Sequence, residues 1–160
     1  VQRLDEGMQS LAEVIKKTTG KDITNYPGAG AAGGMGGGLL AFFNAELKPG
    51  TELLLKAIDF SEKIKGADLI ITGEGKADQQ TAMGKVPYGI LKEAQKEHIP
   101  VIVLAGSIEN LPELNKAGFK GIFSIAPGPI TLEKAMEPEF AKENITRLVS
   151  QLYSVITSFG

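Results

Sequence analysis

The chain has 160 residues, with 17 Lys and Arg against 19 Asp and Glu, and this near balance argues against the basic surface of a nucleic-acid-binding protein. Cysteine is absent and His98 is the one histidine, which excludes disulfides, thiolate metal sites and zinc sites that need two imidazoles. No apolar run reaches the roughly 20 residues of a membrane span, and no signal-peptide core or initiating Met is present, so we expect a cytoplasmic protein without membrane contact that is truncated at its N-terminus.

The first part of the chain predicts helices. An apolar stripe at helical spacing indicates a helix that stops at Gly20. The uninterrupted apolar residues 39–43 predict a buried helix that opens on the glycine-rich run before them, and Pro49-Gly50 then breaks the chain. Thr51 can cap a further helix, and residues 60–65 predict an amphipathic turn or helix. The first stripe consists of Leu4, Met8, Leu11 and Ile15, and the helix after Thr51 carries Leu53, Leu54, Ala57 and Ile58.

The rest of the chain alternates between strands and helices. Three short, β-branched, apolar segments predict parallel strands at 68–72, 101–105 and 121–125. Helices are expected between them at 85–96 and 110–117, and a long helix ends the chain. This order predicts an α/β fold, a Rossmann-like parallel sheet flanked by helices. The last helix has a wide apolar face formed by Ile145, Leu148, Val149, Leu152, Ile156 and Phe159.

The most polar stretch of the chain follows the first predicted strand. Ligands of open α/β sheets bind beyond the carboxyl ends of the strands, so residues 72–85 are expected to form a site in a loop there. Glu74 and Asp78 supply hard oxygen ligands suited to Mg²⁺, and Lys76 and Lys85 can meet phosphate oxygens. Phosphoryl transfer requires such groups, although an ordinary solvated loop explains the same composition about equally well.

Glycines surround these charged residues. Gly73 and Gly75 flank Glu74 and permit a sharp turn and close approach of a ligand to the backbone. Gly84 stands where the next helix begins, so unsatisfied amides there can face an anion. After the second strand, Ser107 can face a ligand across the sheet edge, but a simple turn of the chain explains it better.

Seven of the eleven residues at 28–38 are glycine. The sequence Gly28-Ala-Gly-Ala-Ala-Gly33 matches the dinucleotide pattern GxGxxG, but no predicted strand precedes it, as that pattern requires. A Walker A motif is also absent, because Val86 follows Lys85 where Ser or Thr is needed. Two interpretations of the run are equally favoured: backbone N–H groups that wrap an anion, or small residues that let two helices touch.

Taken together, these motifs resemble the C-terminal part of the type I family of bacterial glycerate kinases. The motifs that carry the resemblance are Gly28-Ala-Gly30-Ala-Ala-Gly33-Gly34, Gly73-Glu-Gly75-Lys76, Asp78, Gln80-Thr81, Gly84-Lys85, Pro87, Gly89 and Ala105-Gly106-Ser107. The resemblance implies ATP-dependent phosphorylation of D-glycerate with Mg²⁺. It also implies a two-domain protein in which a second α/β domain is inserted in a Rossmann-like domain.

The resemblance also implies that this chain lacks the N-terminal half of its parent. Family members are more than twice as long, and their Asp-Ser-Phe-Lys-Gly type motif is missing here. Residues 1–50 would then belong to the inserted domain, and residues 51–160 to the C-terminal part of the Rossmann-like domain. Lys76 stands where many relatives have Arg, which keeps the charge but gives up bidentate phosphate contacts.

The roles expected in such a kinase follow from side-chain chemistry. Asp78 is the candidate base, and Glu74 and Asp78 would hold Mg²⁺ or orient the acceptor hydroxyl. Lys76 and Lys85 would offset charge on the moving phosphoryl group, while the polar Gln80 and Thr81 would bind substrate. The residues expected to enclose an anion are Gly28, Gly30, Gly33 and Gly34.

Two alternatives stay open. The chain can be a non-catalytic fragment that binds an anion or a partner, including a second copy of itself. A dehydrogenase that uses the GxGxxG match is a weaker alternative, because the strand before Gly28 is missing.

Overall fold

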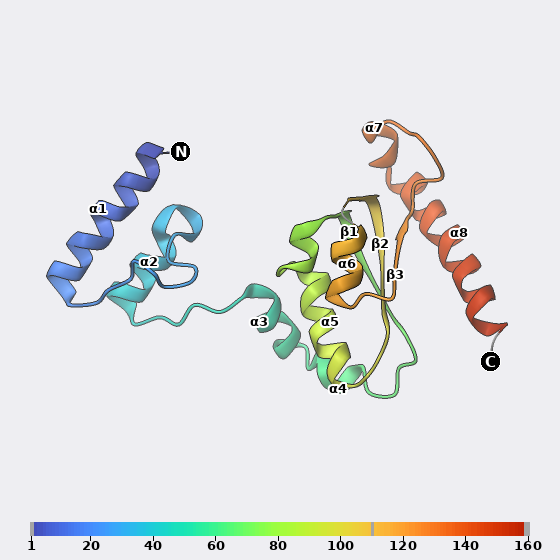
Figure 1. The fold of residues 1–160 in the computed structure, drawn as a ribbon, viewed down its shortest axis with the longest axis horizontal. Coiled ribbons are helices and arrows are strands. Elements are labelled where there is room, and N and C mark those ends of the chain that lie inside the picture. Colours follow the sequence, from blue (N-terminus) through green and yellow to red (C-terminus); the bar gives the residue numbers. More distant parts are fainter. Residues whose placement is uncertain (1, 110, 159–160) are drawn as a thin grey trace. The chain divides into compact units, whose positions relative to one another are not determined.

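The computed structural model describes residues 2–109 and 111–158. The chain forms two compact units, of which the first ends at Pro49 and the second begins at Gly50 (Figure 1). We call them the N-terminal unit and the C-terminal unit and describe each by itself. Their assignment to an inserted and a Rossmann-like domain stays a prediction.

The N-terminal unit is a pair of helices, α1 (Gln2–Thr19) and α2 (Ala31–Phe43). The predicted stop at Gly20 is confirmed, with a positive φ of 75° and a hydrogen bond from its N–H to the Lys16 carbonyl. The small core between the helices consists of Ala12, Ile15, Ile23, Leu40 and Ala41.

The predicted stripe of α1 is only partly the buried one. Ile15 is buried, but Leu4 and Leu11 are exposed, and Ala12 takes part in the core instead. The reason is that α2 crosses α1 at Ala12 and Ile15, and periodicity alone does not reveal where a neighbour crosses.

The helix expected to open on the glycine-rich run is present in α2. Ala32, Gly33 and Gly34 have positive φ (51°, 69° and 91°), so the regular right-handed helix follows from Met35, and it is buried on one side only. Leu40 and Ala41 are buried, while Phe42 and Phe43 are exposed.

The C-terminal unit begins with the helices α3 (Gly50–Ala57) and α4 (Phe60–Lys63). Thr51, expected to cap the first of these, lies inside it. The predicted apolar face is also displaced, because Leu55 is buried and Leu53 and Leu54 are exposed.

A parallel three-stranded sheet follows, with strands in the order β1-β2-β3. Its elements in chain order are β1 (Ile70–Ala77), the 3₁₀ helix η1 (Gln79–Ala82), α5 (Val86–Lys96), β2 (Val101–Ile108), α6 (Leu111–Ala117), β3 (Gly121–Ser124), α7 (Leu132–Ala135) and α8 (Pro138–Thr157). The predicted α/β architecture is therefore confirmed. The helix expected from Asn110 is described from Leu111, because Asn110 lies outside the described residues.

One core joins the sheet to its helices. It contains Ile64, Ala77, Leu91, Ala94, Ile99, Val101, Val103, Ala105, Leu114 and Phe119. α5 starts with Pro87 in its first turn, as predicted, and its Gly89 allows close packing on α3, since a Cβ there would stand 2.3 Å from Thr51 Cγ2. The short connection through η1 brings the start of α5 close to the end of β1, and α5 contacts that strand.

Two strands are longer than expected. The segment from Gly73 to Ala77, predicted as loop, continues β1, because it stays paired with β2 through Lys76 opposite Ser107 and Ala77 opposite Ile108. β2 likewise runs on to Ile108. The loop after β1 is therefore short and begins at Asp78.

The terminal helix α8 is mostly exposed. Asn144 is its one buried residue among those described, while Ile145 and Ile156 of the predicted apolar face are exposed. Phe159 lies outside the described residues. Along the helix, the hydroxyls of Thr146, Ser150, Ser154 and Thr157 donate to backbone carbonyls one turn earlier, at 2.8–2.9 Å.

Across the described parts of the chain, no helix has the length and apolar character to cross a membrane.

Candidate functional site

Asp78 is held by the turn that it begins. It caps η1, and its Oδ1 accepts hydrogen bonds from the backbone N–H of Gln80 (3.0 Å) and Thr81 (3.3 Å). In return, the Thr81 hydroxyl accepts from the Asp78 N–H (3.1 Å), which completes a reciprocal capping box. Thr81 is fully buried and also donates to the Lys76 carbonyl at 3.4 Å. The position of the Asp78 carboxylate is thus set by the chain itself.

Lys85 adds a charge to this arrangement. Its Nζ lies 3.3 Å from Asp78 Oδ1, and the side chains of Lys85 and Asp78 are only 31% and 21% exposed. Burial favours the neutral acid, but the hydrogen bond from Lys85, the amides of Thr81 and Gln80 and the Lys85 charge outweigh it and lower the pKa of Asp78 below its ordinary value. Asp78 is therefore ionised at neutral pH.

The two oxygens of Asp78 have different surroundings. Every hydrogen bond to this carboxylate from the described part of the chain goes to Oδ1, including the one from Lys85. Oδ2 accepts none from those residues. One oxygen is anchored, and the other is free to meet a ligand.

A second ion pair lies at the same edge of the sheet. Lys76, near the end of β1, lies 2.8 Å from Glu109, the residue that follows β2. The Glu109 N–H donates to the Ala77 carbonyl at 2.7 Å, which fixes the two strand ends together. The hydrogen bond and charge of Glu109 raise the pKa of Lys76. Sequence reasoning missed Glu109, because the apolar run that predicts the second strand ends at residue 105 and gives no signal that the strand continues to Ile108.

Glu74 lies within β1, not in a loop, and its Oε1 accepts from the N–H of Gly75 at 3.2 Å. It shares no described hydrogen bond or ion pair with Asp78. Among residues 2–109 and 111–158, no three carboxylate or imidazole groups gather as a complete metal site. Magnesium is usually bound by one or two carboxylates together with phosphates and water, so a role of Glu74 and Asp78 as metal ligands stays a prediction.

The backbone of β1 on both sides of Glu74, at Gly73 and Gly75, is not covered by side chains. A Cβ at Gly75 would meet no atom within 4 Å, and one at Gly73 would make only ordinary contact. At Gly106, in contrast, a Cβ would stand 2.7 Å from the Gly75 carbonyl oxygen, so β1 and β2 approach there as only glycine permits. Gly106 is needed by the fold, and Gly73 and Gly75 leave main chain open to a ligand.

The remaining predicted residues of this region surround the same turn. Gln80 is exposed, Gly84 has a positive φ of 143° directly before Lys85, and Ser107 is an exposed residue of β2 opposite Lys76. The structure therefore brings together, at the ends of β1 and β2, most of the predicted polar groups. Whether they bind substrate stays a prediction.

The glycine-rich run serves packing at two positions. A Cβ at Gly36 would lie 2.3 Å from the Gly28 carbonyl oxygen, and one at Gly37 would lie 2.7 Å from Ile23 Cδ1. The Gly37 N–H also donates to the Ala29 carbonyl at 2.8 Å. Close contact between α2 and the preceding turn therefore explains these two glycines.

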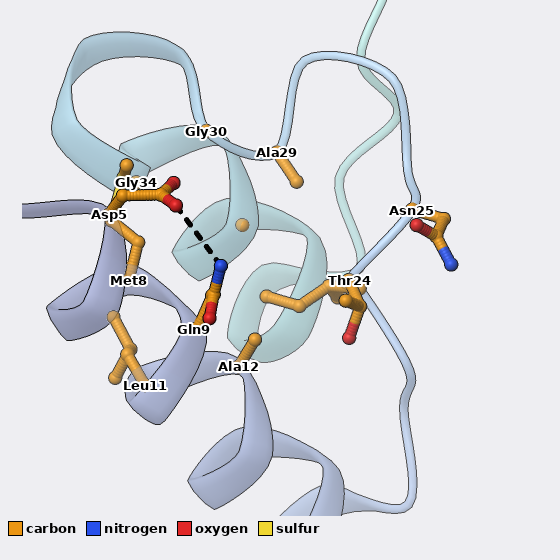
Figure 2. A pocket seen from close by; sticks show the side chains of 12 residues that line it. Asp5, Met8, Gln9, Leu11, Ala12, Thr24, Asn25, Ala29, Gly30 and Gly34 are labelled. Atoms are coloured by element: carbon orange, nitrogen blue, oxygen red, sulfur yellow. Dashed lines mark hydrogen bonds between the residues drawn. The ribbon is translucent and has the colours of Figure 1, made fainter. Parts of the chain in front are cut away.

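The other glycines of the run are not confined in this way. Gly28, Gly33 and Gly34 have positive φ, and a Cβ added at Gly30 or Gly33 would meet no atom within 4 Å. Gly30 and Gly34 line a cavity of about 320 Å³ against α1, which Figure 2 shows with Asp5 hydrogen-bonded to Gln9 at 3.1 Å. The polar groups of this cavity are Asp5, Gln9, Thr24 and Asn25, so part of the run is open to a small ligand.

The comparisons with known proteins point to one family, the glycerate kinases. The model of the glycerate kinase family matches residues 1–157. Glycerate kinase from Halalkalibacterium halodurans is 44% identical over 138 residues, and glycerate 2-kinase from Escherichia coli K12 is 43% identical over 145 residues. These matches cover 86% and 90% of this chain but 36% and 38% of the two relatives.

A solved structure also matches this chain over most of its length. The chain superposes with a TM-score of 0.70 and 34% identity on a Salmonella typhimurium LT2 protein assigned as a glycerate kinase 2. The superposition covers 98% of this chain and 39% of that protein. The chain thus spans well under half the length of the relatives it matches.

Proposed function

The chain belongs to the glycerate kinase family, and from this premise we propose that it forms part of an enzyme that transfers the γ-phosphoryl group of ATP to D-glycerate. The observation that carries the proposal is the ionised Asp78 at the carboxyl edge of β1, with Oδ1 anchored and Oδ2 free. Ligands of open α/β sheets bind at this edge.

Asp78 suits positioning better than proton abstraction. An efficient general base has a pKa near the working pH, whereas Lys85 and the turn amides lower the pKa of Asp78. In phosphoryl transfer the protein contributes mainly positioning and electrostatic stabilisation. We therefore assign Asp78 Oδ2 to the acceptor hydroxyl or to the metal, rather than to a base of raised pKa.

Lys76 and Lys85 supply positive charge near Asp78. Each ammonium has three N–H donors, and each makes one described ion pair, with Glu109 and Asp78 respectively. Donors therefore remain for phosphate oxygens. Gln80, Ser107 and the bare backbone at Gly73 and Gly75 complete the polar lining that we propose for the substrates.

Mg²⁺ would be held by Glu74 and Asp78 and, when bound, would neutralise charge on the phosphate oxygens. The carboxylates of this chain would fill only part of its coordination shell, and phosphates and water the rest. In the N-terminal unit, we propose that the open glycines Gly28, Gly30, Gly33 and Gly34 enclose an anionic group of a substrate through backbone N–H groups.

Asp78→Asn tests the proposal in a whole glycerate kinase that contains this chain. The amide keeps an oxygen in the Oδ1 position, so the cap of η1 survives, but it places an NH₂ group, a donor, where the proposal needs the acceptor Oδ2. We expect turnover to fall by orders of magnitude in a coupled assay for phosphoglycerate, with little change in melting temperature. Glu139→Gln, an exposed acid-to-amide change on α8, is the matched control. Near-normal turnover in Asp78→Asn would remove Asp78 from the mechanism.

A second candidate function is a fragment that binds but does not catalyse. The coverage of only 36–38% of the two glycerate kinases favours it for the isolated chain. Calorimetry of the 160 residues with MgATP and with D-glycerate, beside the coupled assay, separates the two. Binding without turnover assigns the chain as a binding fragment, and turnover assigns it as a complete catalyst.

A further inference from the structure

The helix α2 exposes large apolar side chains on the side that faces away from α1. Phe42 and Phe43 are 63% and 76% exposed, and Met35 and Leu39 are also exposed. Residues 35, 39, 42 and 43 fall on one side of a helix, because they are separated by four, three and one positions. We call these four side chains the outer face of α2.

The composition of α2 indicates that both sides should be covered. Its regular part, from Met35 to Phe43, contains only glycine, methionine, leucine, alanine and phenylalanine. A helix that is apolar all round is typical of a protein interior. In the N-terminal unit, α1 and the preceding turn bury only Gly36, Gly37, Leu40 and Ala41. Within the N-terminal unit, the outer face therefore lacks the apolar layer that is typical of such a sequence.

The relatives of this chain contain polypeptide that could form that layer. The Salmonella structure includes counterparts of 98% of this chain, α2 among them, while 61% of that protein (100% minus the 39% covered) has no counterpart here. The curated relatives extend beyond the matched segment in the same way. A membrane fits less well, because α2 has 13 residues and a span needs roughly 20.

We propose that the outer face of α2 is the docking surface for the rest of a glycerate kinase polypeptide, the portion of the relatives that this chain does not match. The occupant is an apolar layer of that portion, packed on the four side chains. This inference rests on family membership and not on the proposed phosphoryl transfer.

The absence of cysteine from the chain permits a direct test by thiol labelling. Phe42→Cys is prepared in the 160-residue chain and in the whole Halalkalibacterium halodurans relative with its matching segment replaced by this chain. Labelling by a maleimide is followed at position 42 by mass spectrometry. Lys17→Cys, on the exposed end of α1, is the matched control.

We expect Phe42→Cys to react at least about 30-fold more slowly in the whole protein, as for a site that opens only transiently, and Lys17→Cys to react at similar rates in both. Equal rates for Phe42→Cys in the two proteins would overturn the proposal. Slow labelling in the 160-residue chain would overturn the proposal: together with a dimer in light scattering it would assign the face to a second copy, and in a monomer it would assign the face to the chain's own C-terminal unit. Slow labelling only with lipid vesicles would assign it to a membrane.

A second measurement covers the case in which the whole protein with the replaced segment does not fold. The tagged 160-residue chain is co-expressed with the unmatched remainder of the same relative, and the two are purified together. Phe42→Glu should abolish the complex and Lys17→Glu should not; a complex that survives Phe42→Glu would contradict the proposal. Neither readout uses catalysis, so an inactive enzyme leaves this result unchanged, and fast labelling of the Phe42→Cys variant in the whole protein leaves the kinase proposal standing.

Discussion

The Thr81 hydroxyl holds Asp78 in place from inside the turn. It is fully buried, accepts from the Asp78 N–H and donates to the Lys76 carbonyl. Thr81→Val keeps the shape but leaves both backbone groups without this partner. We expect a loss of about 1–3 kcal/mol in the free energy of unfolding, measured by denaturant titration. Thr146→Val on exposed α8, the matched control, should change it by less than about 0.5 kcal/mol.

Asp22 offers a prediction about pH. Its bond to Lys16 (2.6 Å), followed by bonds from Thr24, lowers the pKa of Asp22 to about 2. Because the folded pKa lies below the ordinary 3.8, the stability that Asp22 contributes is complete above about pH 4 and is lost as the pH falls towards 2. An NMR titration of the Asp22 carboxyl should show this midpoint.

Lys16→Met should raise the midpoint of Asp22 only part of the way, since the bonds from Thr24 remain. Lys17→Met is the control and should leave it unchanged. A midpoint near 3.8 in the unsubstituted chain would show that neither the ion pair with Lys16 nor the bonds from Thr24 form in solution.

At the scale of elements, the glycines of α2 divide into two kinds. Gly36→Ala would drive a methyl group into the Gly28 carbonyl, whereas Gly38→Ala meets no atom within 4 Å. We expect the first to destabilise the N-terminal unit by about 1–3 kcal/mol and the second to stabilise it by up to about 1 kcal/mol. Amide hydrogen exchange in α1 and α2 measures both. Equal effects would mean that α2 does not pack on the turn at Gly28.

Sequence periodicity predicted the existence and order of most elements but not their partners. The three strands and the helices between them were expected, because continuous β-branched runs and helical stripes are local signals. The extension of β1 through Lys76 depends on pairing with β2, a contact between distant parts of the chain. The burial of Ala12 and Leu55 in place of larger or neighbouring side chains likewise depends on where another helix crosses.

In the candidate site as well, the residue types were predicted from the sequence, but their contacts were not. Asp78 and Lys85 were predicted from their residue types, and the structure joins them at 3.3 Å. Thr81 was expected to bind substrate, but its described bonds are with the turn, and a substrate contact stays a prediction. Glu109 was not predicted, because β2 continues to Ile108, beyond the apolar run that predicted it. The sequence therefore did not show that Glu109 directly follows the strand.

At the scale of the whole molecule, two separate cores predict independent local unfolding. Ile15 belongs to the core of the N-terminal unit and Leu91 to that of the C-terminal unit. Ile15→Ala should speed amide exchange in α1 and α2 only, and Leu91→Ala should destabilise the sheet unit by about 2–5 kcal/mol without that effect. Exchange that accelerates across both units in either variant would show that they unfold as one.

Four hydroxyls on one side of α8, those of Thr146, Ser150, Ser154 and Thr157, affect the cost of covering that helix. Each of its four donors is already satisfied by a carbonyl of the same helix, so none of them depends on water. If another protein layer covered this flank, none of these four hydroxyl hydrogens would be left without an acceptor. The four side chains therefore add little to the desolvation cost of covering α8.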